Sequence, residues 1–226
     1  MVSTNILQRT FCIKYNEKIG TCFTIDDNGK QYIVTAKHLV EGIADSGTIL
    51  IFHENQWKEL IIKVVGYTPS PVDVAVLSPP MQISPSHHLP ADAGNIYLSQ
   101  DIYFLGFPYG LKIEVGPELN RDFPLPLVKK GIISSMAFNQ EYLDYFLLDG
   151  HNNPGFSGGP VVAYELDKKE LKAIGIISGY RYEWSDVFVQ GQPVSLKYKE
   201  NTGIIVAYCI RHATELIKIN PIGFNL

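Results

Sequence analysis

The sequence has few features that would mark an unusual class of protein. Only three of its 226 residues are cysteine, Cys12, Cys22 and Cys209, and this odd, scattered set argues against a disulfide framework. Charged residues make up 19% of the chain, the formal net charge is −4, and no basic stripe is present. Nucleic acid and membrane surfaces are therefore not predicted as partners. No apolar run reaches the roughly 18 residues of a membrane span.

A secretory signal is also missing from the start of the sequence. The segment Met1–Thr10 has neither a basic patch nor a long apolar core. Together with the three thiols, which we expect to be reduced, this absence predicts a cytoplasmic protein. Helical periodicity is scarce as well. Only Arg211–Ile219, with Ala213, Leu216 and Ile217 at helical spacing, predicts a helix, which Pro221 terminates.

Short strands separated by turns account for most of the chain. Hydrophobic residues make up 46% of the sequence, enough for a sizeable core. The segments rich in β-branched and aromatic residues are Gly20–Ile25, Gln31–Thr35, Thr48–Phe52, Glu59–Tyr67, Asp73–Leu77, Asp101–Gly106, Lys130–Met136, Tyr145–Leu148, Pro160–Tyr164, Ala173–Ile177 and Gly203–Ile210. Asn28-Gly29 predicts a hairpin between the first two. This pattern predicts an all-β fold of two packed β-barrels. Residues 110–127 form an expected long loop of functional or regulatory character.

The segment from His151 to Pro160 contains a serine held between glycines. Glycine permits positive φ and close backbone approach, so Gly155-Phe156-Ser157-Gly158-Gly159 can present the Ser157 hydroxyl on a tight loop. Two backbone N–H groups of such a loop can form an oxyanion hole beside a nucleophile. The loop therefore predicts nucleophilic catalysis by Ser157.

Two further residues supply what a serine nucleophile needs. His38 follows the predicted strand Gln31–Thr35, and Asp73 opens an alternating apolar run. An imidazole can take the proton of a serine hydroxyl, and a carboxylate can fix the imidazole tautomer and stabilise the imidazolium. His38, Asp73 and Ser157 therefore form a candidate catalytic triad.

The order of these residues and their local strings resemble the trypsin-like serine peptidases, most closely the HtrA/Deg branch. The resemblance covers nearly the whole chain. It rests on Thr35-Ala36-Lys37-His38, Asp73-Val74-Ala75-Val76-Leu77, Asn153-Pro154-Gly155-Phe156-Ser157-Gly158-Gly159-Pro160, Gly106-Phe107-Pro108-Tyr109-Gly110, Gly131-Ile132-Ile133-Ser134 and the strand Gly203–Tyr208.

The resemblance implies one peptidase domain built from two six-stranded antiparallel barrels and a short C-terminal helix. The barrels would span about residues 1–96 and 97–210, and the helix residues 211–219. By resemblance, His38 would be general base and then general acid, Asp73 would orient it, and Ser157 would attack the scissile carbonyl. The N–H groups of Gly155 and Ser157 would hold the oxyanion. Protein or peptide substrates would bind along His151, Asn152, Asn153, Pro154, Ser178, Gly179, Tyr180, Gly203 and Ile205, without a metal or other cofactor.

Three departures refine this expectation. Phe156 stands where trypsin-like zymogens have an aspartate that pairs with a new N-terminus, so activation by N-terminal cleavage is not expected. No acidic residue lies at the expected pocket base near His151, which favours cleavage after apolar or modest-sized residues. Residues 220–226 are too few for the PDZ domain that HtrA/Deg proteins often carry.

Alternative interpretations stay open at this point. A trypsin-like fold could be catalytically latent, and act as a protein- or peptide-binding module or need a partner for activation, if the Pro154–Gly155 peptide were flipped. Gly155-x-Ser157-x-Gly159 also fits the nucleophile elbow of α/β-hydrolases, which would require the order Ser157, Asp186, His212. That elbow needs a helix after the serine, whereas Pro160-Val161-Val162 predicts a strand. His87-His88 could bind a metal, but no third ligand lies nearby in the sequence. The oligomeric state and the natural substrate are not predicted.

Overall fold

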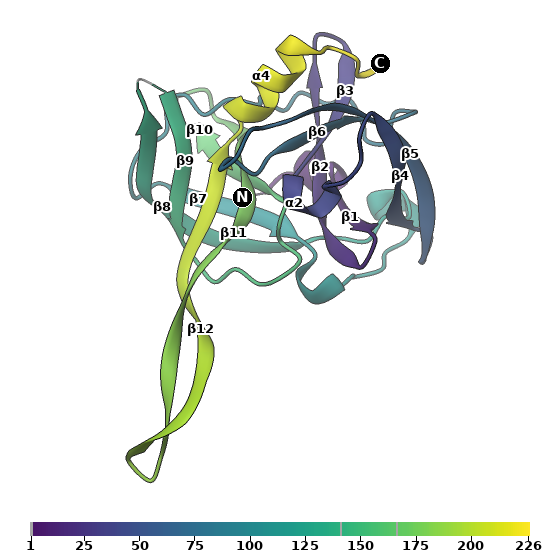
Figure 1. The fold of residues 1–226 in the computed structure, drawn as a ribbon. Helices are drawn as coiled ribbons and strands as arrows, with labels where there is room; N and C mark the ends of the chain where they lie inside the picture. The colour runs from purple at the N-terminus through teal and green to yellow at the C-terminus, as the bar shows by residue number, and fades with distance from the viewer. Residues whose placement is uncertain (1, 141, 166) are drawn as a thin grey trace.

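The computed structural model describes residues 2–140, 142–165 and 167–226 and confirms the all-β prediction (Figure 1). The N-terminal strands are β1 (Thr10–Tyr15), β2 (Lys18–Asp27), β3 (Lys30–Thr35), β4 (Ser46–His53), β5 (Gln56–Tyr67) and β6 (Ala75–Ser78). The later strands are β7 (Asp101–Gly106), β8 (Leu127–Asn139), β9 (Tyr142–Asp149), β10 (Pro160–Glu165), β11 (Glu170–Val189), β12 (Gln192–Cys209) and β13 (Phe224–Asn225). The helices are α1 (Thr4–Gln8), α2 (Lys37–Val40), α3 (Pro117–Asn120) and α4 (Arg211–Ile219), and a short 3₁₀ helix, η1 (Pro108–Gly110), follows β7.

The strands form two antiparallel rings. The first sheet has the order β13-β3-β2-β1-β4-β5-β6, and the pairing of β3 with β6 closes six of these strands into a ring. β13 is added at the free part of β3, next to Lys30 and Gln31. The second sheet is a closed barrel with the order β10-β11-β12-β9-β8-β7. The expected pair of six-stranded barrels is thus confirmed, with β13 as an addition to the first.

The turn between β2 and β3 shows how local sequence sets the register. Asp27 pairs with Lys30, so the loop between them is the two residues Asn28-Gly29. Both have positive φ, 48° and 74°, as a type I′ turn requires. The hairpin that the sequence predicts here is present.

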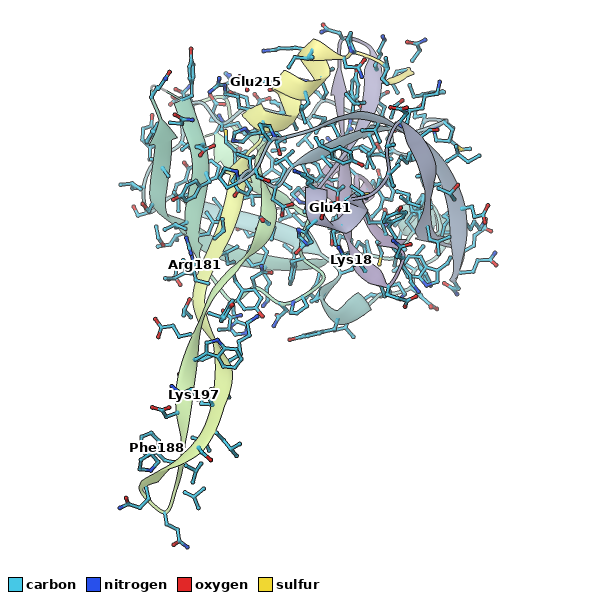
Figure 2. All side chains as sticks on the ribbon, viewed as in Figure 1. Lys18, Glu41, Arg181, Phe188, Lys197 and Glu215 are labelled. Atoms are coloured by element: carbon cyan, nitrogen blue, oxygen red, sulfur yellow. The ribbon has the colours of Figure 1, made fainter. Side chains whose placement is uncertain are left out.

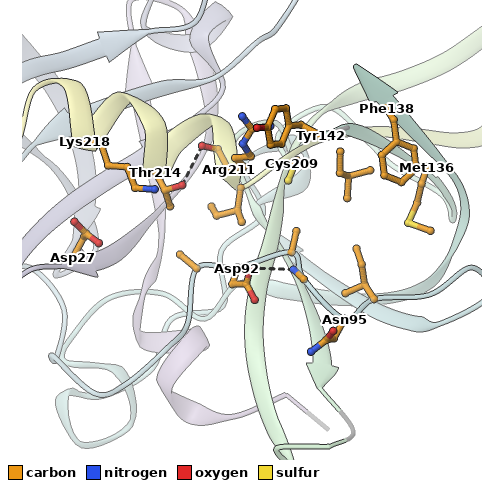
Figure 3. Close-up of a pocket in the computed structure, with 16 residues that line it drawn as sticks. Asp27, Asp92, Asn95, Met136, Phe138, Tyr142, Cys209, Arg211, Thr214 and Lys218 are labelled. Carbon is orange, nitrogen blue, oxygen red and sulfur yellow. Dashed lines mark hydrogen bonds between the residues drawn. The ribbon is translucent and has the colours of Figure 1, made fainter. Parts of the chain in front are cut away.

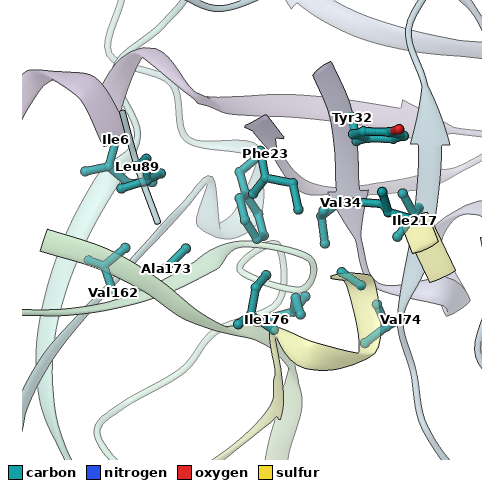
Figure 4. Close-up of a cluster of buried hydrophobic side chains, with 14 of the residues drawn as sticks. Ile6, Phe23, Tyr32, Val34, Val74, Leu89, Val162, Ala173, Ile176 and Ile217 are labelled. Atoms are coloured by element: carbon teal, nitrogen blue, oxygen red, sulfur yellow. The ribbon is translucent and has the colours of Figure 1, made fainter. Parts of the chain in front are cut away.

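A buried apolar cluster joins the two barrels and the last helix (Figure 4). Phe23 and Val34 come from the first barrel and Ile176 from the second, and all are fully buried. Ala213 and Ile217, four residues apart on one side of α4, complete this cluster. Because both barrels and α4 contribute to one core, the relative position of the barrels is fixed by packing. None of the described helices is long and apolar enough to cross a membrane.

The structure differs from the sequence-based expectation at several elements. It adds three short helices (α1, α2 and α3), the strand β1 and the two-residue strand β13. The aspartate expected to open a strand, Asp73, lies before β6, which begins at Ala75. The largest difference concerns β11 and β12, which we expected to span only Ala173–Ile177 and Gly203–Ile210. Both strands continue far beyond the barrel to a tight turn at Gln190-Gly191, where both residues have positive φ, 49° and 77°.

Candidate active site

The three candidate catalytic residues lie on separate elements, at the junction of the two barrels. His38 belongs to the one-turn helix α2, which follows β3. Asp73 precedes β6, and the Lys37 N–H donates to its backbone carbonyl. Ser157 lies in the turn between β9 and β10. The fold therefore brings residues from both barrels to one place, although they are up to 119 positions apart in the sequence.

His38 and Asp73 form a directly hydrogen-bonded pair. His38 Nδ1 lies 2.7 Å from Asp73 Oδ2, and the backbone N–H of His38 donates to Asp73 Oδ1 at 2.8 Å. Burial by itself would raise the pKa of Asp73, but the hydrogen bonds from His38 and Ser178 outweigh it and hold the pKa below its usual value. An ionised carboxylate only accepts hydrogen bonds, so Nδ1 carries the proton and Nε2 of the neutral ring is left as an acceptor.

Ser178 connects Asp73 with Ser157. Its hydroxyl donates to Asp73 Oδ2 at 2.6 Å, and its carbonyl oxygen accepts a hydrogen bond from Ser157 Oγ at 2.9 Å. Within the described residues, Ser157 Oγ makes no hydrogen bond to His38. The hydroxyl is therefore bonded to Ser178 and must rotate toward His38 before it can lose its proton. Hydrogen bonds between catalytic groups are often incomplete in the absence of substrate and form in the substrate complex.

The Pro154–Gly155 peptide has a defined orientation. The carbonyl oxygen of Pro154 accepts the backbone N–H of Tyr109 at 2.7 Å. Because the peptide is planar and trans, the N–H of Gly155 points in the opposite direction. The N–H groups of Gly155 and Ser157 donate to no atom of the described residues, so both are available to a ligand. The arrangement is compatible with an oxyanion hole.

Gly155 and Gly158 cannot be replaced by larger residues without rearrangement. Gly155 has a φ of +104°, and a Cβ at this position would collide with the carbonyl oxygen of Phe107. Gly158 has a φ of +81°, and its Cβ would collide with the carbonyl oxygen of Thr21. The loop can pack this closely against β2 and the preceding turn only because both residues lack a side chain.

Phe156 anchors the same loop from the other side. Its ring is fully buried and contacts Phe104 in an edge-to-face arrangement, with ring centroids 5.1 Å apart. Apolar packing in the second barrel thus holds the loop where a trypsin-like zymogen uses an ion pair. The expectation that N-terminal cleavage does not activate the protein stays a prediction with this packing as its structural support.

Thr21 of β2 is a positioning residue that the sequence analysis missed. Its hydroxyl donates to the Gly155 carbonyl oxygen at 2.7 Å and accepts the Phe107 N–H at 3.1 Å. Its own N–H donates to the Ser157 carbonyl oxygen at 2.9 Å. A threonine in a β-strand gives no signal of such a role, because its partners are 86 and 134 residues away in the sequence.

The residues expected to form the substrate pocket lie together. Ile205 of β12 is fully buried and pairs with Tyr180 of β11. Gly203 accepts the Gly150 N–H at 2.9 Å, which joins β12 to the segment His151–Pro154. In that segment Asn152 is buried, and its Oδ1 has no hydrogen-bond partner among the described residues. The remaining expected residues, Ser178 and Gly179, lie on β11 beside Ser157.

Lys129 of β8 is a second residue missed from the sequence. Its ammonium group donates to the His151 carbonyl oxygen and, at 3.2 Å, to Asn153 Oδ1. Desolvation lowers the pKa of this lysine below its usual value. The Lys129 ammonium group is therefore held against the segment His151–Pro154, which would line the pocket.

A well-defined cavity lies away from the candidate triad. It has a volume of about 590 Å³ and lies between the segment 91–96, β8, β9 and α4 (Figure 3). Asp92, Cys209, Arg211 and Lys218 are among its lining residues, and none of the candidate site residues contributes to it. The candidate triad is thus not part of this cavity.

The alternative residue sets considered from sequence are not assembled. Asp186 pairs with Lys197 on the long hairpin, and His212 Nε2 bonds to Asp144 Oδ1 at 2.8 Å. Neither residue approaches Ser157, so the triad Ser157, Asp186 and His212 that an α/β-hydrolase would need is not assembled. His88 Nε2 lies 3.7 Å from Glu170 Oε2, a single acidic neighbour.

Comparison with known proteins is consistent with this geometry. The profile of the trypsin-like peptidase domain matches residues 20–169. A curated relative, described as a probable periplasmic serine endoprotease DegP-like from Pseudomonas savastanoi pv. phaseolicola (strain 1448A / Race 6), is 28% identical over 148 residues. The match covers 64% of this chain and 26% of the relative, so the chain spans about a quarter of that protein's length.

Solved structures share the fold over nearly the whole chain. A serine-to-alanine variant of the HtrA-type protease AlgW with tripeptide has a TM-score of 0.61 at 23% identity, covering 96% of this chain and 63% of that chain. The inactive form of a serine-to-alanine mutant of Rv3671c from M. tuberculosis H37Rv has a TM-score of 0.61 at 18% identity, covering 96% and 88%. At these identities the likeness concerns the fold.

The comparison corrects the cytoplasmic location expected from the sequence. The curated relative is periplasmic by its description, which contradicts that expectation. Reduced thiols suggest a reducing compartment, but all three are free and buried. Burial raises the pKa of Cys12 to about 12 and that of Cys209 to about 11. Buried, protonated thiols are inert, so they carry no information about the compartment.

The domain match spans most of the chain and the HtrA-type structures share its fold, and on this basis the chain belongs to the trypsin-like peptidase domain family.

Proposed function

We propose that the protein is a serine endopeptidase that hydrolyses peptide bonds through an acyl-enzyme. The observation that carries this proposal is the hydrogen-bonded connection from His38 through Asp73 and Ser178 to Ser157. It combines an oriented imidazole, an ionised carboxylate and a hydroxyl within one network. A metal or organic cofactor is not required for this chemistry.

In the first step His38 Nε2 takes the proton of Ser157 Oγ as the oxygen attacks the scissile carbonyl carbon. Asp73 accepts from Nδ1–H and stabilises the resulting imidazolium. The carbonyl oxygen becomes an oxyanion that the N–H groups of Gly155 and Ser157 would stabilise. Collapse of this intermediate breaks the peptide bond, and the imidazolium gives its proton to the leaving amine. Water then repeats the sequence on the acyl-enzyme and frees Ser157.

The substrate would bind in an extended conformation along Ser178, Gly179 and Tyr180 of β11. Its residue before the scissile bond would enter the space bounded by His151–Pro154, Gly203 and Ile205. Main-chain hydrogen bonds to a strand edge recognise an extended peptide with little regard to sequence. This mode suits protein substrates in an unfolded state. The description of the curated relative supports a periplasmic location for this activity.

A reactive fluorophosphonate probe tests the proposal. We expect covalent labelling of the wild-type protein and its loss in Ser157→Ala, together with hydrolysis of an unfolded protein by the wild type only. In serine peptidases, loss of the nucleophile lowers kcat by about a million-fold. Folding of the variant is checked by its thermal unfolding. Labelling that persists in Ser157→Ala would contradict the proposal.

One observation favours a second candidate function. The Ser157 hydroxyl is bonded to the Ser178 carbonyl oxygen and not to His38. The protein could thus be a catalytically latent member of the fold that binds peptides or becomes active with a partner. The same probe separates the two candidates. An intact, folded wild type that binds unfolded peptides but is never labelled would support the latent form.

A further inference from the structure

β11 and β12 continue beyond the second barrel as a two-stranded arm. We define the arm as residues 181–202, paired from Tyr182–Asn201 to Val189–Gln192. Figure 1 shows it projecting well away from both barrels, and Figure 2 shows the labelled side chains Arg181, Lys197 and Phe188 along its length. A two-stranded ribbon alone is only marginally stable in water. An arm of this length therefore suggests a function that requires it.

One edge of the arm begins at the proposed nucleophile. Up to Ile177, this edge of β11 is hydrogen-bonded to β10 and to the loop around Ser157. In that loop, Gly158 and Gly159 exchange backbone hydrogen bonds with Ile177. From Ser178 onward no strand of the described residues covers this edge. The Ser178 carbonyl oxygen points to it, because it accepts the Ser157 hydroxyl. The edge proposed to bind the substrate at Ser178–Tyr180 thus continues along the arm.

The arm carries an aromatic face next to this edge. Tyr182 and Trp184 are 49% and 61% exposed, and their rings lie 6.3 Å apart in an edge-to-face arrangement. Lys199, which pairs with Trp184, places its ammonium group 3.8 Å from the Tyr182 ring centroid and 5.8 Å from that of Tyr180. These side chains therefore share one face. Long, exposed apolar edge strands attract further strands, and proteins usually protect them.

Charge does not specify a partner for the arm. Its cations Arg181, Lys197 and Lys199 are equal in number to its anions Glu183, Asp186 and Glu200. Its exposed large apolar residues are Tyr182, Trp184, Phe188, Val189, Leu196 and Tyr198. A partner of matching chemistry is an extended, apolar polypeptide segment rather than a charged surface.

We infer that the arm is an extended subsite for unfolded polypeptide substrates, an inference that rests on the proposed function. The substrate adds to β11 as an antiparallel strand, with the residue before the scissile bond opposite Ser178. Because both strands rise by about 3.3 Å per residue, the distance from Ser178 to Trp184 corresponds to about six substrate residues, or roughly 20 Å. Apolar side chains of that segment pack on Tyr182 and Trp184, and main-chain hydrogen bonds hold it to the edge.

Binding to Ser157→Ala tests the inference, because this variant retains the edge and cannot cleave. Two fluorescein-labelled unstructured peptides share the same sequence around the scissile bond. One has three residues before that bond, and the other has eight with alternating apolar side chains. Fluorescence anisotropy gives the dissociation constants. We expect the long peptide to bind at least tenfold more tightly than the short one, as four or five additional cross-strand positions would allow.

Arm variants locate the source of this gain. The gain is the ratio by which the long peptide binds more tightly than the short one. In Tyr182→Ala/Trp184→Ala, made in the Ser157→Ala background, we expect this ratio to fall below threefold while the short peptide binds as before. Tyr198→Ala is the matched control, since Tyr198 is also 49% exposed but pairs with Ser185 on the other face of the arm. The control should keep the full gain. Two further long peptides are N-methylated at one or the other set of alternate residues among the five added positions. If the peptide pairs with β11 through its main chain, only one of the two should lose its tighter binding.

Equal gains in the aromatic-face variant and the control would overturn the inference. So would light scattering that shows the aromatic-face variant to dissociate from a dimer while the gain persists, because the arm would then contact a second copy of the chain. Failure of the proposed function gives a different result. Wild-type protein would leave the short peptide uncleaved and Ser157 unlabelled, while arm-dependent binding of the long peptide would still be measured.

Discussion

The backbone N–H of Tyr109 donates to the carbonyl oxygen of Pro154 at 2.7 Å, and this contact sets the direction of the Pro154–Gly155 peptide. The sequence alone leaves the orientation of this peptide undetermined, and this orientation distinguishes a competent active site from a latent one. Tyr109 itself has a positive φ of 54° in the turn after β7, so a strained residue presents the N–H group. The turn Phe107–Gly110 thus supports the orientation that a competent oxyanion hole needs.

Gly155→Ala is expected to disrupt this arrangement. A Cβ at residue 155 would collide with the Phe107 carbonyl oxygen, so the loop must shift and one oxyanion donor would be displaced. Loss of one donor typically lowers kcat by 100- to 1000-fold. Steady-state hydrolysis of an unfolded protein measures the effect. Gly29→Ala is the control, because Gly29 also has a positive φ, +74°, but its Cβ would have no neighbour within 4 Å. A similar loss of activity in both variants would refute the steric explanation.

The stability of the protein should depend on the ionisation of Asp73. Its pKa is lower in the folded protein than the usual value of about 3.9, so ionised Asp73 stabilises the folded state. This contribution is complete above the usual pKa and disappears as the pH falls through the lower, folded-state pKa. We expect Asp73→Asn to be less stable than the wild type at neutral pH, with a difference that shrinks in acid.

Chemical unfolding at a series of pH values measures this dependence. Asp101→Asn is a suitable control, since Asp101 forms an exposed ion pair with Lys130 that should contribute little at any pH. A constant difference between Asp73→Asn and the wild type from neutral to acidic pH would contradict the assignment.

Local sequence patterns were sufficient for much of the fold because the responsible interactions are local. Alternating apolar residues marked most strands, Asn28-Gly29 marked a hairpin, and Ala213 and Ile217 marked the inner face of α4. The hairpin at Gln190-Gly191 was missed since its strands lie outside the barrel. Its strands do carry apolar alternation, at Tyr182 and Trp184 and at Val194, Leu196 and Tyr198, but most of these side chains are exposed and belong to no barrel core.

The candidate site was only partly predictable for a related reason. His38, Asp73 and Ser157 are embedded in short recognisable strings, and the structure brings them together. The roles of Thr21 and Lys129 arise from contacts with distant segments, and neither residue stands in a distinctive local pattern. Positioning residues of this kind become visible only when the chain is folded.

Cleavage should favour an apolar residue before the scissile bond. The expected pocket is bounded by buried Ile205 and Asn152, and the Lys129 ammonium group lies behind its His151–Pro154 wall. This cation opposes a positively charged substrate side chain. Cleavage sites in a proteome-derived peptide digest, compared with Ser157→Ala, measure the preference. A profile dominated by arginine or lysine would contradict the prediction.

Lys129→Met should weaken the exclusion of basic residues at this position. Removing the cation eliminates its repulsion, so we expect cleavage after arginine and lysine to increase several-fold relative to the wild type. Lys130→Met is the matched control, because Lys130 pairs with Asp101 on the outer surface. The explanation fails if both variants shift the profile equally or neither shifts it.

Thr21→Val should separate loop positioning from general stability. The substitution keeps the shape of the side chain but removes the hydroxyl that bonds to Gly155 and Phe107, which leaves two buried polar groups without this partner. We expect a loss of about 1–3 kcal/mol in the free energy of unfolding. The loop would also populate its competent geometry less often, so labelling of Ser157 by a fluorophosphonate should slow. Thr24→Val provides the comparison, since Thr24 is equally buried on β2 and its hydroxyl bonds to Ser84, away from the loop. It should cost similar stability in urea unfolding and leave the labelling rate unchanged; equal slowing in both variants would mean that Thr21 acts through stability alone.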